Sequence, residues 1–153
     1  MTNPRPAPAG SDGTVRPVII DPATRRYLLH PAADAVPVSW TVPAVPMRPG
    51  EHYRLTTVRY LRHELRIPAL RIAAVVGRLP AGRDRDRVEY LVLAAPPAAV
   101  WPHDVRARLA SGARWWTTAQ LRDAGVSVEP GTLTLLMEGY WEGWLPDGEI
   151  SLE

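Results

Sequence analysis

Short hydrophobic runs bounded by turn residues occupy the first part of the chain. A β-branched run over 15–21 ends at the turn signal Asp21-Pro22-Ala23-Thr24, and an apolar segment over 25–30 follows it. Two such runs joined by turn residues predict a β-hairpin. The next stretch, 32–50, is rich in proline, which bars regular helix and predicts short extended pieces and loops.

A helical period follows between Glu51 and Arg66. Apolar residues recur there at spacings of three and four, which predicts one amphipathic helix with these side chains on its buried face. They are Leu55, Val58, Leu61 and Leu65. Proline and glycine at 49–50 and proline at 68 are typical of the residues that flank a helix.

Two further apolar runs, 70–79 and 88–95, predict a second hairpin. The charged segment between them, 81–87, is predicted as its solvated turn. The proline-rich segment 96–104 is predicted as a loop, and 113–118 as a strand.

The C-terminal pattern predicts a short helix over 119–125, ended by Gly125, and a last helix that opens at Glu129-Pro130. The side chains expected on one face of the last helix are Leu133, Leu136, Met137, Tyr140 and Trp141, with Trp144 on the same side as Trp141. Strands and helices interleave without a long βαβ repeat, so the pattern predicts a mixed α+β sandwich.

Composition narrows the class of protein. The chain has 153 residues, 46% hydrophobic and 22% charged, as in an ordinary globular domain. Residues 1–14 combine proline, glycine and small polar residues and predict a flexible tail before a single domain over 15–153. No apolar run approaches the ~20 residues that span a bilayer. With no cysteine for disulfides or thiolate sites, we expect a cytoplasmic protein without a membrane partner.

All 18 basic residues are arginine, and none is lysine. Together with much alanine and valine and 17 prolines, this bias indicates a GC-rich bacterial genome. The arginines are scattered and the net charge is only +2, so we expect no nucleic-acid partner.

Residues 40–67 resemble the Nudix hydrolase family, whose box reads G-x5-E-x7-R-E-U-x-E-E-x-G-U after a W-x-L-P lead-in. Trp40-Thr41-Val42-Pro43 stands at the lead-in, and Gly50-Glu51 stands at the start of the helix. The positions that match further along are Arg59, Leu61, Glu64 and Ile67. Segments 15–30 and 113–121 are similar to the family's opening hairpin and late strand with its short helix. The resemblance covers most of 15–144 and implies the Nudix α/β/α sandwich, a small mixed sheet between helices.

The box is degenerate at four positions. Val45 stands at the first glycine, Tyr60 at the glutamate after the arginine, His63 at the first paired glutamate, and Arg66 at the late glycine. In the family the three glutamates hold a divalent metal against a diphosphate. This chain keeps only Glu64, so the charge of the site falls from about −3 to −1 and Mg²⁺ should bind weakly.

The resemblance implies roles for individual residues. Glu51 and Arg59 are expected to form a structural ion pair between loop and helix. Tyr60, His63 and Glu64 are the candidate catalytic residues, and His63 with Glu64 is the candidate set for a weak Mg²⁺ or Mn²⁺ site. Imidazole suits Mn²⁺ better than Mg²⁺. A base for the attacking water has no clear candidate near Trp115, and Glu89 and Asp104 are the alternatives.

Arginines and tryptophans supply candidate ligand-binding residues, namely Arg59, Arg62, Trp115 and Trp116. In a strand, Trp115 and Trp116 point to opposite faces, so one is expected in the core and the other can face a groove. The six tryptophans also suit core packing and a homodimer interface.

Three functions therefore stay open. The first is a Nudix-like cleft that binds a nucleotide-like or phosphate-bearing small molecule with weak or no metal-dependent pyrophosphohydrolase activity. The second is an active hydrolase that cleaves a nucleoside diphosphate derivative with rearranged metal ligands. The third is a non-hydrolytic enzyme that uses Tyr60, His63 and Glu64 for acid–base chemistry.

Overall fold

The computed structural model describes residues 13–33, 38–67, 71–81, 84–97, 100, 102–110 and 112–152. Most of the predicted tail therefore lies outside the described residues, but Thr14, its predicted last residue, already begins a strand. No helix of the described part is long and apolar enough to cross a membrane.

The first predicted hairpin is confirmed. Strand β1 (Thr14–Asp21) pairs antiparallel with β2 (Arg26–Pro31), with Ile20 opposite Tyr27. Asp21 closes the turn, because its carboxylate accepts a hydrogen bond from the Thr24 hydroxyl at 2.6 Å. Aspartate at the start of a turn commonly makes this kind of local bond.

The second predicted hairpin is also confirmed, and it is longer than expected. Strands β5 (Arg71–Ala81) and β6 (Asp84–Ala95) pair antiparallel, so most of the charged segment 81–87 is strand rather than solvated turn. Pairing with a long neighbour can carry a strand through charged residues, because the ladder bonds join main-chain groups. β6 also pairs parallel with β1 over six residue pairs, which joins the two hairpins.

Short strands complete a mixed sheet that has nine strands in the described residues, in the order β8-β3-β2-β1-β6-β5-β9, with β4 on β1 and β7 on β2. These are β3 (Ser39–Thr41), β4 (Val45–Pro46), β7 (Arg114–Trp116), β8 (Ser127–Glu129) and β9 (Gly148–Ser151). The sequence pattern did not predict β8 or β9, because each is three or four residues long and mostly exposed.

Four helices accompany the sheet in the described residues: α1 (Tyr53–His63), α2 (Pro102–Leu109), α3 (Thr118–Ala124) and α4 (Leu133–Glu142). Thr117 and Gln120 form a capping box at the start of α3, and Gly125 ends it in the left-handed conformation as predicted. The loop predicted over 96–104 is wrong at its end, where Pro102 opens α2. Proline suits the first turn of a helix because its missing N–H has no helical partner there.

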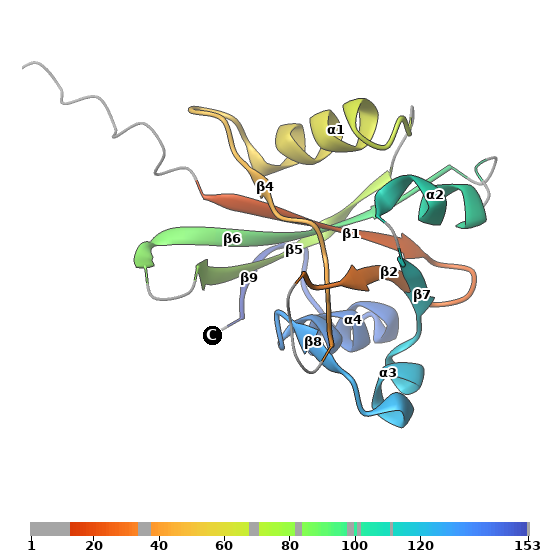
Figure 1. The fold of residues 1–153 in the computed structure, drawn as a ribbon. Coiled ribbons are helices and arrows are strands. Elements are labelled where there is room, and N and C mark those ends of the chain that lie inside the picture. Colours follow the sequence, from red (N-terminus) through yellow and green to blue (C-terminus); the bar gives the residue numbers. More distant parts are fainter. Residues whose placement is uncertain are drawn as a thin grey trace, which may run out of the picture.

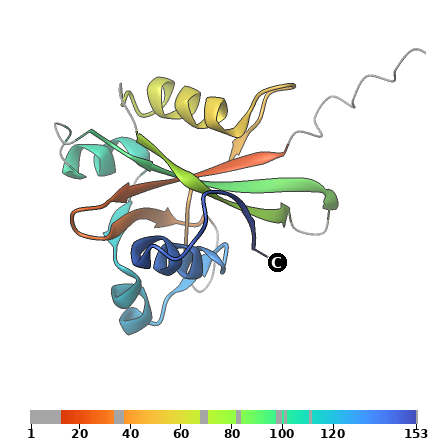
Figure 2. The ribbon, with the colours of Figure 1, turned by 180° about the vertical axis from the view of Figure 1, so that it is seen from behind.

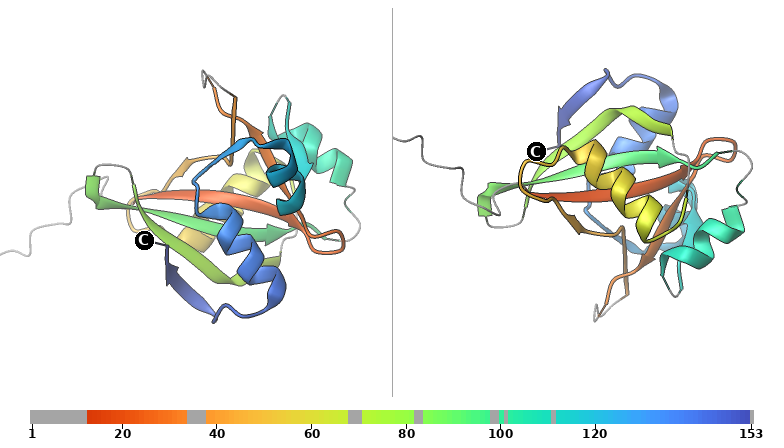
Figure 3. Two further views of the ribbon diagram at one scale, coloured as in Figure 1. Left: turned by 90° about the horizontal axis from the view of Figure 1, so that it is seen from below. Right: turned by 90° about the horizontal axis from the view of Figure 1, so that it is seen from above.

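Helices cover both faces of the sheet. α1 and α2 lie on one side and α3 and α4 on the other (Figure 1), and the view from behind shows the same layers (Figure 2). Seen from above, α1 crosses over β1 and β6 (Figure 3). The predicted α+β sandwich with a mixed sheet between helices is therefore confirmed.

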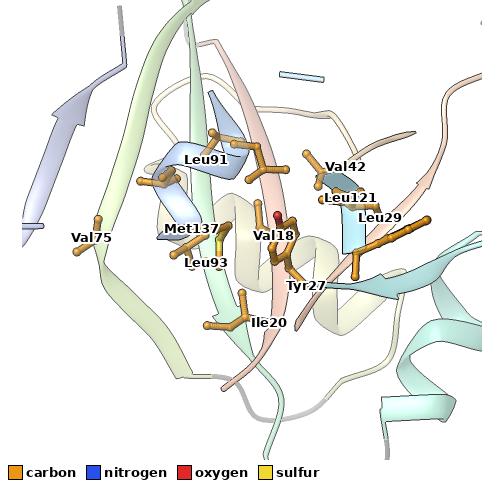
Figure 4. Close-up of a cluster of buried hydrophobic side chains, with 13 residues drawn as sticks. Val18, Ile20, Tyr27, Leu29, Val42, Val75, Leu91, Leu93, Leu121 and Met137 are labelled. Atoms are coloured by element: carbon orange, nitrogen blue, oxygen red, sulfur yellow. The ribbon is translucent and has the colours of Figure 1, made fainter. Parts of the chain in front are cut away.

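Alternate residues of the central strands pack on opposite faces of the sheet. Val18 and Ile20 of β1, with Leu93 of β6, pack under α4 against Met137 (Figure 4). Ile19 and Ala94 face the other way. They pack with side chains of α1 and α2, namely Leu61, Leu65 and Val105. The alternation is the period of a strand buried on both faces.

At the end of α4 the prediction for Trp144 is wrong, because the helix stops at Glu142 and this side chain is 61% exposed.

Candidate functional site

The resemblance places the candidate site on α1 and its flanking loops. The helix begins after His52, whose ring nitrogen accepts a hydrogen bond from the backbone N–H of Arg54 at 3.2 Å. Its buried residues are Tyr53, Thr56, Thr57 and Leu61. The predicted stripe is therefore wrong at Leu55, which is 62% exposed.

Two threonines take the buried positions that the hydrophobic pattern assigned to leucine and valine. Each hydroxyl has a local partner, since Thr57 donates to the Tyr53 carbonyl at 2.8 Å and Thr56 donates to Glu51 at 2.6 Å. A satisfied hydroxyl can be buried at little cost, so the polar residues sit under the helix without a penalty.

Glu51 and Arg59 form the structural ion pair implied by the resemblance. The Arg59 Nη2 and Nε atoms donate to the two Glu51 oxygens at 2.8 and 3.0 Å, a bidentate arrangement. Arg59 also donates to the carbonyl of Pro46 at 3.2 Å, and the backbone N–H of Arg48 donates to Glu51 at 3.2 Å. The pair therefore ties β4 and the loop to the helix.

These bonds shift the titration of both partners. The Arg59 and Thr56 hydrogen bonds lower the pKa of Glu51 to about 2 from 4.5. The carboxylate raises the pKa of Arg59 in turn. These bonds use the Nε and Nη2 donors of Arg59 to position the loop, so its Nη1 donors are the ones left for a ligand.

The loop after α1 has a left-handed residue at Arg66, where the resemblance implies a glycine. Arg66 has φ of 54°, in the left-handed region, and the Ile67 N–H donates to the Leu61 carbonyl at 3.0 Å. This bond joins residues six positions apart and closes the end of the helix, where glycine is the common left-handed residue. Arg108 of α2 donates to the Arg66 carbonyl at 3.1 Å and holds the turn.

Tyr60 lies on α1 where the box has a metal-binding glutamate. Its side chain is half-buried and packs against the apolar cluster of Leu61, Leu65 and Val105. Burial, with a smaller contribution from the Glu64 carboxylate, raises the pKa of the phenol. A neutral phenol in an apolar setting is a poor ligand for a hard cation.

His63 and Glu64 are both exposed at the end of the helix, and so is Arg62. Glu64 stands close enough to Arg59 and Tyr60 to influence the pKa of each. Within the described residues, no three histidine, aspartate or glutamate side chains come together in a way that would hold a metal ion. The structure thus brings the three candidate catalytic residues to one end of α1 without a carboxylate cluster.

The two alternatives for a base, Glu89 and Asp104, lie on different elements, β6 and α2. Glu89 is two residues before Leu91 and four before Leu93 on β6, so it shares their face, which packs on the α3 and α4 side of the sheet. Its carboxylate pairs with Arg16 at 3.7 Å. Glu89 therefore lies on the face away from α1. Asp104 is exposed in the first turn of α2.

The two tryptophans of β7 point to opposite faces, as predicted. Trp116 is 5% exposed and packs edge-on against Trp40 in the core. Trp115 is half-buried on the other face, and its indole N–H donates to the Pro102 carbonyl at 2.9 Å. Only Trp115 of this pair is placed to contact a ligand, because it lines a cavity.

That cavity has a volume of about 670 Å³ and lies where β1, β5, β6 and β7 meet the start of α2. Sequence reasoning did not single it out, because its walls come from five separate segments. Most of the lining is apolar, and its charged residues among those described are Asp21 and Arg71. The box residues of α1 lie outside this described lining.

Solved structures show what this arrangement is similar to. A C. elegans Ap4A hydrolase superposes with a TM-score of 0.61 and 21% identity, over 88% of this chain and 98% of that chain. A NUDIX hydrolase from Nitrosomonas europaea gives a TM-score of 0.55 and 17% identity, over 89% of this chain and 92% of that chain. This is the Nudix fold. A NUDIX family hydrolase from Clostridium perfringens agrees, with a TM-score of 0.54 and 8% identity, over 88% of this chain and 98% of that chain. No family model and no curated protein matches the sequence.

On the Nudix fold, the helix that carries the box is α1, and the residues present do not fit the divalent metal that the family uses. Glu64 offers one exposed carboxylate, and Tyr60 offers a phenol whose pKa is raised. Mg²⁺ requires several oxygen ligands in a near-ideal octahedron. In the segment that resembles the box, the structure shows the Glu51–Arg59 pair and the left-handed turn at Arg66.

Proposed function

We propose that this Nudix-fold protein binds a nucleotide-like, phosphate-bearing small molecule and hydrolyses it weakly or not at all with a divalent metal. The observation that carries the proposal is the packing of Tyr60 into the apolar cluster under α1, at the position of a metal-binding glutamate. With Tyr60 and His63 in place of two glutamates, one carboxylate remains at this end of the helix.

The family chemistry needs more negative charge than this site holds. A divalent metal that protein ligands hold in place neutralises the diphosphate and lowers the pKa of the attacking water, and for Mg²⁺ these ligands are mainly carboxylates. Glu64 is exposed to water and lies near the Arg59 guanidinium, so it offers a metal little more than a surface carboxylate does. Pyrophosphate cleavage through this box is therefore expected to be slow.

Ligand binding, in contrast to hydrolysis, is supported by the ordered loops around α1 and by an exposed arginine at its end. The loop–helix–loop is held by the bidentate Glu51–Arg59 pair, so the scaffold is preserved while the metal ligands are lost. The exposed Arg62 can meet an anion at the end of α1. The three neighbours of the same fold named above are hydrolases, and one is an Ap4A hydrolase, which favours a nucleotide-like ligand over an unrelated one. We expect this ligand to be a soluble cytoplasmic molecule rather than nucleic acid or membrane.

A hydrolysis assay tests the proposal. The full chain is incubated with nucleoside diphosphate sugars and dinucleoside polyphosphates with Mg²⁺ or Mn²⁺, and released phosphate is measured for wild type, Glu64→Gln and the exposed control Glu142→Gln. We expect product at or near background in all three. Metal-dependent turnover that Glu64→Gln abolishes and Glu142→Gln preserves would overturn the proposal in favour of an active hydrolase.

Binding is measured separately. Thermal unfolding of the wild type is followed with the same compounds in EDTA, because a ligand that binds the folded state raises the melting temperature. At least one compound is expected to raise it without metal. A panel that leaves the melting temperature unchanged would count against the binding half of the proposal.

A further inference from the structure

The cavity beside Trp115 has the size and lining of a ligand site. Its volume of about 670 Å³ falls within the range of small-molecule pockets, ~300–1,000 Å³. Such pockets are mostly apolar with a few polar groups that fix the ligand's orientation. Here the apolar wall includes Trp115, Val100 and four prolines, which are Pro22, Pro96, Pro97 and Pro102.

Trp115 is held in a fixed position on this wall. Its indole N–H is bonded to the Pro102 carbonyl at 2.9 Å, and the Arg26 guanidinium lies 5.8 Å from its ring centroid. Arg26 is in turn paired with Asp21 at 3.3 Å. The aromatic side chain is therefore preorganised, and a ligand ring that packs against it loses little of its affinity to the ordering of protein groups.

Arg71 and Asp21 stand on opposite sides of β6. Asp21 ends β1, Arg71 begins β5 opposite Ala95, and β6 runs between these two strands. Two strand spacings separate β1 from β5, about 9.6 Å. The cavity thus has a carboxylate at one side, a cation at the other and an apolar floor between them.

The Arg71 side chain is exposed and has no hydrogen bond or ion pair among the described residues. A guanidinium in this position can bind a phosphate by a charge-assisted, bidentate bond. Asp21 already accepts from Thr24 and Arg26, yet a carboxylate has about four acceptor positions and can take a further donor, such as an amino or hydroxyl group.

We infer that this cavity binds a nucleoside monophosphate, with the base against Trp115, a donor group of the nucleoside on Asp21 and the phosphate on Arg71. One unpartnered cation among the described lining residues suits a single phosphate better than a diphosphate. The class of ligand, a nucleotide, rests on the proposed function. The location is different, because the described lining of the cavity does not include the box residues of α1. Metal has no part in this binding.

Isothermal titration of the full chain in EDTA tests the inference, with AMP, GMP, CMP and UMP as probes and with the matching nucleosides beside them. At least one monophosphate is expected to bind the wild type. Arg71→Gln should weaken that binding about tenfold or more, because a bond between ionised groups exceeds the ~1.4 kcal/mol that a factor of ten requires. The nucleoside should bind wild type and Arg71→Gln alike.

Arg78→Gln is the matched control, since Arg78 is an exposed arginine of the same strand that does not line the cavity. It should bind the monophosphate as the wild type does. Equal binding by Arg71→Gln and Arg78→Gln would overturn the inference while leaving the proposed function standing, and loss of binding in Arg62→Gln alone would place the ligand at α1 instead. If no monophosphate binds but a larger compound of the hydrolysis panel does, the inference fails and the proposed function survives. If nothing binds, both fail.

Discussion

Glu51 accepts hydrogen bonds from three different residues. The titration of its carboxyl makes the contribution of these bonds to the free energy of unfolding measurable. The carboxyl has a pKa of about 2 in the folded protein against 4.5 as its ordinary value. A group whose pKa is lower in the folded state stabilises the fold fully above its unfolded pKa and loses that effect as the pH falls. The contribution of Glu51 is therefore complete above about pH 4.5 and declines toward pH 2.

Glu51→Gln should lower the free energy of unfolding at pH 7 by about 2 kcal/mol, the scale of hydrogen bonds to charged groups. Urea unfolding at pH 7, 5, 4 and 3.5 measures the free energy of unfolding of both proteins. The difference between the variant and the wild type should shrink only below about pH 4.5. The control is Glu142→Gln, whose ion pair with Arg25 is largely exposed and should contribute little at any pH. A constant difference across the range would mean that the ion pair is not its source.

Arg66 is one of two described non-glycine residues with a left-handed backbone, and the other is Arg25 in the first hairpin turn. A non-glycine residue in the left-handed region costs roughly 1–2 kcal/mol, and the loop holds Arg66 there at φ of 54°. Arg66→Gly removes this strain but adds freedom to the unfolded chain, so the net gain in unfolding free energy should be at most about 1 kcal/mol. The backbone carbonyl that Arg108 contacts is kept.

Arg62→Gly is the matched control, because Arg62 is exposed within α1 and glycine there costs about 1 kcal/mol relative to a good helix former. Urea unfolding of the two variants should give changes of opposite sign. A loss at Arg66 as large as the loss at Arg62 would contradict the assignment of strain to the turn.

At the scale of the element, the hydrophobic pattern of α1 predicts that a helix forms but not which of its faces is buried. The period of the apolar residues correctly predicts a helix here, but its orientation is set by Tyr53, Thr56 and Thr57, which are buried through contacts and hydrogen bonds that no pattern of apolar residues reports. Leu55 is turned outward as a result. Helix existence follows from local period, whereas the buried face depends on tertiary partners.

Leucine truncations on α1 test this orientation. Leu61 is fully buried and Leu55 is 62% exposed. Leu61→Ala should reduce the free energy of unfolding by about 2–5 kcal/mol through lost burial and a cavity, while Leu55→Ala should change it by less than about 0.5 kcal/mol. Guanidinium unfolding of the two variants measures both. Similar losses for the two would restore the stripe that the sequence pattern predicts.

The other elements also divide into those that local sequence signals predict and those that depend on distant partners. Both hairpins, α3 with its glycine cap at Gly125, and α4 are visible from turn residues and period, since those signals are local. The predicted opening of the last helix at Glu129-Pro130 is wrong, because Glu129 lies in β8 and α4 begins at Leu133. α2 was missed because its segment is rich in proline, and β8 and β9 because they are short and owe their pairing to β3 and β5. Strands that exist only through a distant partner leave little trace in their own sequence.

At the scale of the whole molecule, the sequence predicts the Nudix-type sandwich and the residues of its box, but not the cavity beside Trp115. The box is one continuous segment with fixed spacing, so its residues can be named from the sequence. The cavity is assembled from segments as distant as Asp21, Arg71 and Trp115, which only the sheet order brings together. The burial of Tyr60 likewise depends on packing beside α2, which the sequence did not predict.

The proposed lack of a tight divalent-metal site on α1 is tested most directly by isothermal titration of the full chain with Mn²⁺ and with Mg²⁺. Wild type and Glu64→Gln should both bind so weakly that no saturation is reached below about millimolar metal, since a single exposed carboxylate remains at the box. Tyr60→Glu/His63→Glu, checked for folding by circular dichroism, restores three carboxylates and should bind at least about tenfold tighter. Saturation of the wild type at micromolar metal, abolished by Glu64→Gln, would contradict the account.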